Sequence, residues 1–83
     1  MVSNIFYKAS VEKDLRKIDQ QVAKRVITKL EKAFVEEAQP GLPLKGEFEG
    51  LFKYRVGDYR VIYTPVKDGI LVLRVAHRRE SYR

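Results

Sequence analysis

The spacing of apolar residues divides the chain into a helical first half and a stranded second half. Between residues 11 and 34 apolar positions recur at intervals of mostly three or four, which is the period of an amphipathic helix. After Pro43 the period changes to two, which is typical of strands. The change falls in the turn-forming stretch 39–43, and no linker or internal repeat interrupts the chain. The pattern therefore predicts a single α+β domain over residues 1–83.

The helical half is predicted to contain a short strand, residues 4–8, and two helices of about residues 10–18 and 20–38. Isoleucine and two aromatic residues follow one another in the first segment, as in a strand. Ser10 is a candidate N-cap for the first helix, and Asp19 is one for the second. A hairpin of two helices turns both apolar stripes to one side. We therefore expect the helices to cover one face of a sheet and to leave the other face free for a ligand.

The stranded half carries turn signals at Gly57-Asp58 and Asp68-Gly69, which predict three consecutive strands in an antiparallel meander. With Gly57 and Asp58 as a two-residue turn, the first hairpin pairs Val56 with Tyr59, Arg55 with Arg60, Tyr54 with Val61, Lys53 with Ile62, and Phe52 with Tyr63. One face then collects side chains that can pack on the helices: Phe52, Tyr54, Val56, Tyr59, Val61 and Tyr63. The opposite face collects Lys53, Arg55 and Arg60. Like charges directly opposite destabilise a sheet, so an anionic ligand is expected there.

The second hairpin admits two registers. In one, a two-residue turn points Arg74 and Arg78 at the helices. In the other, a three-residue loop with Gly69 in the left-handed conformation and a bulge turns Leu71, Leu73 and Val75 toward the core. Because burying two unpaired guanidinium groups costs far more than a bulge, we predict the second register. The basic residues that then share one face are Lys53, Arg55, Arg60, Arg74 and Arg78.

Positive charge is concentrated in the stranded half. The chain has 17 Lys and Arg against 11 Asp and Glu, which gives a net charge of +6. On the predicted helices basic and acidic residues alternate, as on a solvated surface. From Lys53 onward there are eight basic residues and three acidic ones, so the excess lies on the sheet. Polyanions, meaning nucleic acid or an acidic protein, are the leading partners of such a surface.

Composition excludes several kinds of site. The chain has no Cys and one His, His77, which excludes a disulfide framework, a thiolate nucleophile, a Cys-based zinc site and a multi-histidine metal site. It also lacks a phosphate-binding Gly-rich loop and a nucleophile elbow. There is no run of 18 apolar residues and no signal-peptide cleavage pattern, so we expect a cytoplasmic protein without a membrane partner and without a cofactor.

Three segments of the chain resemble a known family. They are residues 44–46 (Leu-Lys-Gly), 51–63 (Leu-Phe-Lys-Tyr-Arg-Val-Gly-Asp-Tyr-Arg-Val-Ile-Tyr) and 75–82 (Val-Ala-His-Arg-Arg-Glu-Ser-Tyr). The chain is similar over essentially its whole length to the RelE/ParE superfamily of bacterial and archaeal toxins, most closely to its RelE branch. The resemblance implies a ribosome-dependent mRNA interferase, metal-independent, that cuts the codon in the A site. It also implies a cognate acidic antitoxin that holds the toxin inactive.

The resemblance implies a role for each matching residue. Lys53 matches the lysine proposed as base or electrostatic activator of the 2′-hydroxyl, and Arg55 stands where a second lysine often occurs. Arg60 matches the arginine that stabilises the phosphate. Arg78 matches the arginine proposed as general acid or transition-state clamp. Tyr82 matches the tyrosine that stacks on the mRNA base and orients it.

Further contacts with the substrate are assigned to four residues near this set: Lys45, Arg74, His77 and Arg79. For His77 a structural role is equally open, because it falls on the inward register of its strand. The sequence departs from the family pattern at Ser81, where Val is usual, and at Ala76, where Gly is frequent.

The same residues suit RNA cleavage on chemical grounds. Cutting RNA through its own 2′-hydroxyl needs a positioned nucleophile, a route for protons and stabilisation of a phosphorane with extra negative charge. Arginine is a poor proton carrier but a good bidentate phosphate clamp, so Lys53 is the better candidate base. Without a histidine pair, the enzyme is expected to be slow on free RNA and to depend on the ribosome to position its substrate.

Two other functions stay open on the sequence. One is a ParE-like toxin that poisons DNA gyrase and does not cut RNA. The other is a non-catalytic nucleic-acid-binding module that acts with an antitoxin as a repressor and reaches operator DNA only through that complex. Mapping mRNA 5′ ends in a translating extract distinguishes these functions from an interferase, whose partners are the ribosome and mRNA.

Overall fold

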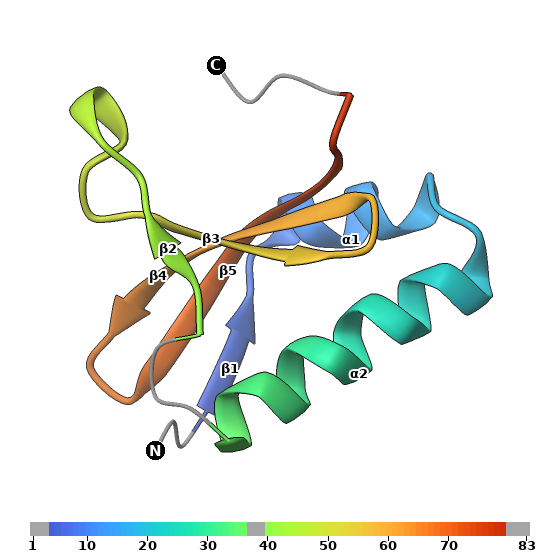
Figure 1. Ribbon diagram of the computed structural model, residues 1–83. Helices are drawn as coiled ribbons and strands as arrows, with labels where there is room; N and C mark the ends of the chain where they lie inside the picture. The colour runs from blue at the N-terminus through green and yellow to red at the C-terminus, as the bar shows by residue number, and fades with distance from the viewer. Residues whose placement is uncertain (1–3, 37–39, 80–83) are drawn as a thin grey trace.

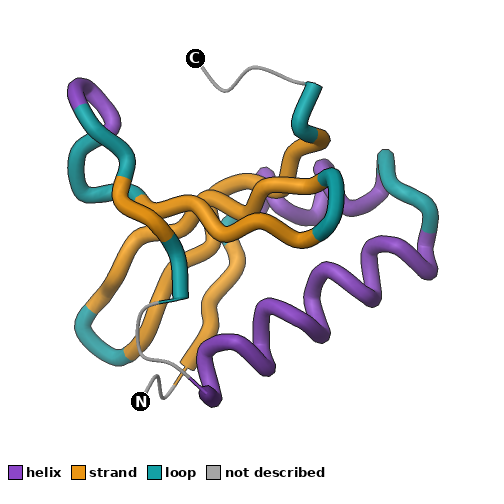
Figure 2. The backbone as a smooth tube through the Cα atoms, in the orientation of Figure 1, coloured by secondary structure: helices purple, strands orange, loops and turns teal. Residues whose placement is uncertain are grey.

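A five-stranded sheet and two helices make up the fold (Figures 1 and 2). The structure is a computed structural model and describes residues 4–36 and 40–79. In chain order the elements are β1 (Asn4–Tyr7), α1 (Ala9–Arg16), α2 (Gln20–Glu36), β2 (Leu42–Pro43), a 3-10 turn η1 (Gly46–Phe48), β3 (Phe52–Val56), β4 (Tyr59–Val66) and β5 (Gly69–His77). The predicted strand, helical hairpin and three-stranded meander are confirmed. The two-residue strand β2 was not predicted.

The strand order β1-β5-β4-β3-β2 places the first strand beside the last one. β1 runs parallel to β5, with Asn4 opposite Gly69 and Tyr7 opposite Val72, because the two helices carry the chain back across the sheet between them. A side chain could not be accommodated at position 69, since a Cβ there would overlap the Asn4 carbonyl group. β1 and β2 are therefore the two edges of the sheet.

Both helices cover the same face of the sheet, which we call the covered face; the other we call the open face. The core on the covered face comprises Val11, Val26, Leu30, Phe34, Val56, Val61, Tyr63, Ile70, Val72 and Val75. Tyr63 is fully buried, with Phe34 edge-on at 5.0 Å between ring centroids and Phe52 stacked at 5.6 Å. Burial raises the pKa of the Tyr63 phenol, although the Gly41 N–H that donates to its oxygen at 2.9 Å partly opposes the rise.

The two helices begin differently from one another. Asp19 caps α2 as predicted, because its carboxylate accepts a hydrogen bond from the Gln21 N–H at 3.1 Å. The prediction of Ser10 as the N-cap of α1 was wrong. Lys8 occupies that position without a side-chain cap, and the Ser10 hydroxyl instead donates to the Leu73 carbonyl at 2.8 Å. Neither of these two described helices is long and apolar enough to cross a membrane.

The β3–β4 hairpin has the predicted register at every position. Phe52 lies opposite Tyr63 and Val56 opposite Tyr59, so Arg55 is directly opposite Arg60. Gly57 adopts a positive φ of 58° in the two-residue turn, a conformation that glycine takes at little cost.

The predicted register of the β4–β5 hairpin was wrong. Val66 lies opposite Gly69, so the turn has two residues, and the register shifts further along, between Ile62 and Tyr63. Tyr63 lies opposite Val72 and Ile62 opposite Arg74, which leaves Leu73 as the extra residue of a bulge. The buried residues before the bulge are therefore Ile70 and Val72, and Leu71 and Leu73 are only partly buried. After the bulge Val75 faces the core, as predicted.

Candidate functional site

Four basic residues gather at one part of the open face, and we call this set the basic face: Lys53, Arg55, Arg60 and Arg78. The first two alternate along β3 with Tyr54 and Val56, which pack on the covered side. Arg60 lies between Arg55 on β3 and Ala76 on β5. Side chains directly opposite in an antiparallel pair have Cβ atoms about 5 Å apart, so the two guanidinium groups can reach a single anion.

Arg78 lies just beyond the end of β5, and because His77 is on the covered side, continued alternation assigns Arg78 to the open side with this set. Its N–H donates to the Asp58 carbonyl at 2.7 Å, and its Nε lies 3.7 Å from the Asp58 carboxylate. Both side chains are more than half exposed, and exposed ion pairs of this length contribute little to stability. Asp58 therefore holds the backbone of Arg78 beside the turn between β3 and β4 and leaves its side chain accessible to a ligand.

The floor of the basic face is apolar. Ile62 and Ala76 point to the open side, yet each is only 4% exposed. Ile62 lies between Lys53 and Arg74 in the ladder, and the aliphatic stems of such long side chains can cover a residue between them. The Nε of Arg60 is also shielded from solvent. Arg60 therefore acts on a bound anion more strongly than the exposed Arg55 and Arg78, whose charges are screened by water.

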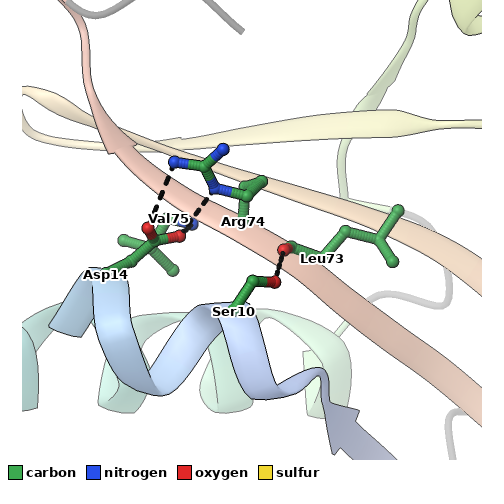
Figure 3. Close-up of polar contacts among 5 residues, drawn as sticks. All are labelled: Ser10, Asp14, Leu73, Arg74 and Val75. Atoms are coloured by element: carbon green, nitrogen blue, oxygen red, sulfur yellow. Dashed lines mark hydrogen bonds and ion pairs between the residues drawn. The ribbon is translucent and has the colours of Figure 1, made fainter.

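Arg74 is engaged elsewhere. Its Nε and Nη2 donate to the two carboxylate oxygens of Asp14 on α1, at 2.9 and 3.1 Å (Figure 3). Asp14 is only 8% exposed and also accepts a hydrogen bond from the Val75 N–H at 2.9 Å. Arg74 is on the open side as predicted, but its guanidinium group is paired with α1 and is not directed to the basic face.

His77 lies on the covered side of the sheet. Its ring meets the Tyr59 ring edge-on at 5.2 Å, and its Nδ1 accepts the Arg79 N–H at 3.2 Å. Together with residues of α2 and the β3–β4 turn, it lines a hollow of about 420 Å³. The inward register predicted for His77 is confirmed, and this register separates the imidazole from Lys53 and Arg60.

Of the remaining predicted residues, the structure describes Lys45 and Arg79. Lys45 is exposed in the loop that carries η1, which projects beyond the sheet in Figure 1. Arg79 is exposed next to Arg78. Tyr82 lies outside the described residues.

An open hollow of about 440 Å³ adjoins the basic face beside the beginning of β2, at the edge of the sheet. Its lining residues are Pro40, Leu42, Lys53, Tyr54 and Arg55. Leu42 is 66% exposed, so an apolar surface lies next to two cations. That combination suits a nucleotide, whose base is flat and apolar and whose phosphate is an anion.

Asp14 was missed by the analysis of the sequence, although a signal was present. The position lies three residues after Val11 and four before Ile18, on the apolar stripe of the first helix. A carboxylate at such a position needs a cation or several hydrogen-bond donors. Among residues 4–36 and 40–79, no group of three acidic or histidine side chains is placed to hold a metal ion.

The arrangement is suited to a phosphate that gains charge during a reaction. Guanidinium groups bind phosphate oxygens bidentately, and Arg55, Arg60 and Arg78 offer three of them around an apolar floor. Lys53 adds an ammonium group that can exchange a proton. The described site thus combines anion binding with one group capable of proton transfer.

Comparison with known proteins identifies the family and relatives of similar fold. Residues 5–82 match the family model described as the ParE toxin of the type II toxin-antitoxin system parDE. Toxin RelE of Mycobacterium tuberculosis is 30% identical over 79 residues, which cover 90% of this chain and 80% of that protein. The toxin-antitoxin complex RelBE2 of the same organism contains a chain with a TM-score of 0.84 and 26% identity, covering 94% of this chain and 100% of that one. The archaeal RelE-RelB complex from Pyrococcus horikoshii gives a TM-score of 0.69 at 26% identity, covering 98% and 100%.

Proposed function

This chain belongs to the RelE/ParE superfamily of type II toxins, and we propose that it is an endoribonuclease that cuts mRNA in the ribosomal A site and so stops translation. The observation that supports the proposal is the basic face: Lys53, Arg55 and Arg60 share the open face above the apolar residues Ile62 and Ala76, and Arg78 follows just beyond β5. Two of the arginines lie directly opposite each other, at a cost in stability that a bound phosphate would remove.

The proposed reaction is attack of a ribose 2′-oxygen on the adjacent phosphorus. Lys53, in its neutral amine form, takes the proton of the 2′-hydroxyl, the bond from phosphorus to the 5′-oxygen of the next nucleotide breaks, and that oxygen receives a proton from water. The hydroxide that remains takes the proton held by Lys53, so that the neutral amine is regenerated. The products are a 2′,3′-cyclic phosphate and a free 5′-hydroxyl. Arg60 and Arg78 bind the non-bridging oxygens and stabilise the negative charge that develops on them. Arg55 adds a third guanidinium group on the same phosphate.

The ribosome supplies what the site lacks. Accurate placement of the 2′-hydroxyl in line with the leaving oxygen is worth several orders of magnitude in rate, and the basic face is an open surface rather than a deep cleft. A codon held in the A site presents one phosphodiester in a fixed conformation. The protein then has to contribute only charge and a proton acceptor, and free RNA should be cut slowly.

The proposed partners follow from the same assignment. Relatives in solved complexes are bound to a RelB antitoxin, and we assign to this chain a cognate acidic antitoxin that neutralises it. The ribosome and mRNA are its targets. Operator DNA is contacted only through the antitoxin complex. The net charge of +6 favours binding of an acidic partner.

The test is to add the purified protein to a translating extract and to map mRNA 5′ ends. Cuts at fixed positions within codons, lost in Arg60→Ala or Arg78→Ala, support the proposal. Replacing Lys67 in the exposed β4–β5 turn by Ala removes the same charge away from the basic face and should leave the cuts unchanged.

The matched family model bears the name of the ParE toxin, so a second candidate is inhibition of DNA gyrase without RNA cleavage. The same preparation added to a gyrase supercoiling reaction distinguishes the two. Intact mRNA together with stalled gyrase complexes would replace the proposed function by this one.

A further inference from the structure

α1 supplies the hydrogen-bond partners along the edge of β5 beyond the point where β1 ends. β1 pairs with residues 69–72 of β5, and the Lys8 N–H makes a last bond of 3.0 Å to the Val72 carbonyl. The chain then turns into α1. One turn of α1 supplies both next partners: Ser10 donates to the Leu73 carbonyl at 2.8 Å, and Asp14 accepts from the Val75 N–H at 2.9 Å (Figure 3).

These contacts lie at the bulge of β5. Leu73, whose carbonyl Ser10 binds, is the extra residue between Val72 and Arg74. Asp14 binds the two residues that follow it, Arg74 through the side chain and Val75 through the backbone. A bulge interrupts the ladder and leaves polar groups that need other partners. Two side chains of α1 provide them.

The bulge decides which side chains of the end of β5 reach the basic face. Before it, Ile70 and Val72 point to the covered side. Without an extra residue, strand alternation would turn Arg78 to the covered side as well. With the extra residue, Val75 and His77 point to the covered side, and Arg78 follows on the open side.

We propose that Ser10 and Asp14 are positioning residues that fix the bulge of β5 and thereby hold Arg78 on the basic face. We call the two residues the α1 clamp. The inference rests on the proposed function for its catalytic consequence, whereas its structural part, the register of residues 74–78, does not depend on that function.

The chemistry of Asp14 supports this role over simple packing. Val11 and Leu15 on the same helical stripe pack in or against the core, and an apolar residue at position 14 could do so too without the cost of burying a carboxylate. Asp14 instead accepts three hydrogen bonds from β5, two of them from a bidentate guanidinium group. Such contacts are directional and add to the apolar pattern in specifying one register.

The same geometry gives Arg74 a new assignment. Its side chain completes the α1 clamp, so it acts through Asp14 and not by touching RNA. A double-mutant cycle on cutting of ribosome-bound mRNA, with Asp14→Ala and Arg74→Gln, separates the two roles. A clamp residue predicts that the double variant is within about twofold of Asp14→Ala alone. Losses that multiply would show that Arg74 contacts the RNA independently and would overturn this assignment.

The closing experiment measures register and turnover on the same proteins. The nuclear Overhauser effect between the Tyr59 and His77 rings reports the register. Their centroids are 5.2 Å apart with the bulge present, and strand alternation without the extra residue would turn His77 to the open side. In Asp14→Ala this signal should be lost, and kcat on programmed ribosomes should fall roughly ten- to hundredfold with KM unchanged. Asp14→Asn keeps an oxygen that can accept from the Val75 N–H and should recover part of both.

Asp19→Asn is the matched control. It makes the same chemical change in a carboxylate that caps α2 and does not touch β5, so the ring signal and kcat should stay at their wild-type values. Asp14→Ala with an intact ring signal and wild-type kcat would overturn the inference. So would a raised KM at unchanged kcat. If the wild type cuts no mRNA, the proposed function fails, and the ring signal of Asp14→Ala alone decides the structural part.

Discussion

The covered and the open face of the sheet are built from alternate residues of the same strands, yet one face is buried and apolar and the other is charged. On the covered face Val56, Val61 and Tyr63 are buried against the helices. On the open face the intervening positions include Arg55 opposite Arg60. Burial of apolar area stabilises the fold, whereas opposed like charges weaken it. The difference indicates that the covered face provides the stability that allows the open face to hold its cations in an unfavourable arrangement.

The largest expected effect comes from breaking the covered face. Phe34→Ala removes a side chain that is 2% exposed and meets Tyr63 edge-on, and it should lower the free energy of unfolding by about 3–5 kcal/mol. Val35→Ala, one residue later and 68% exposed, should change it by less than about 0.5 kcal/mol. Urea titrations give both values. Equal losses in the two variants would contradict the assignment of the core.

The next effect comes from the open face and concerns rate. Arg60→Ala should lower single-turnover cutting on ribosomes about 100- to 1000-fold, because a charge aimed at the developing phosphorane is lost. The free energy of unfolding should not fall with it, since Arg55 is relieved of an opposing charge. Lys67→Ala serves as the equal-charge control and should cut at the wild-type rate. A rate for Arg60→Ala near that of the control would remove Arg60 from the site.

A smaller effect tests the cost of the opposed arginines directly. Arg55→Thr should raise the free energy of unfolding by a few tenths to about 1 kcal/mol while slowing the cutting of mRNA. Lys53→Thr makes a similar change on the same strand, but Lys53 lies opposite Ile62, so no comparable gain is expected. Guanidinium titrations of both variants provide the comparison. A stability gain for Lys53→Thr equal to that for Arg55→Thr would mean that no specific repulsion exists.

The smallest effect concerns the pH dependence of the covered side. Burial is the larger cause and the Glu31 carboxylate the smaller cause that raise the pKa of Tyr7 to about 12. The Tyr7 hydroxyl donates to Oε2 of Glu31 at 3.4 Å. A raised pKa means that the folded state favours the neutral phenol, so this contribution is full below about pH 10 and is lost as the pH rises toward 12. Tyr7→Phe should make the fall in unfolding free energy shallower, and Glu31→Gln should do so less, because burial is the larger cause. Thermal unfolding between pH 8 and pH 12 measures the slopes, and identical slopes in all three proteins would refute the contact.

The β3–β4 hairpin could be predicted from neighbouring residues in the sequence. Gly57 and Asp58 stand between two runs of strict alternation, and the two-residue turn determines every pair between β3 and β4. The helical stripes are equally local, and both helices were found close to their predicted bounds. From these elements alone Lys53, Arg55 and Arg60 could be assigned to one face.

The β4–β5 hairpin could not be predicted in this way. Its bulge does not lie at the turn, where the sequence has a glycine, but at Leu73, where α1 binds the strand. The contact between Asp14 and Arg74 joins residues 60 positions apart, and no local pattern encodes it. Arg74 was nevertheless predicted correctly to lie on the open side. Any single bulge between the turn and Arg74 shifts the inward and outward positions of the following residues by one, wherever the bulge lies. What could not be predicted was that Asp14 would engage the guanidinium group.

A ribosome programmed with an mRNA that carries one 2′-deoxy nucleotide at the cut position of the A-site codon tests whether the 2′-oxygen is the nucleophile. If the basic face cuts RNA by stabilising attack of the 2′-oxygen on the adjacent phosphorus, this mRNA stays intact, and an all-ribose control is cut to a 2′,3′-cyclic phosphate and a 5′-hydroxyl. Cutting of the deoxy-substituted mRNA at the same bond and at a similar rate would show that the 2′-oxygen is not the nucleophile.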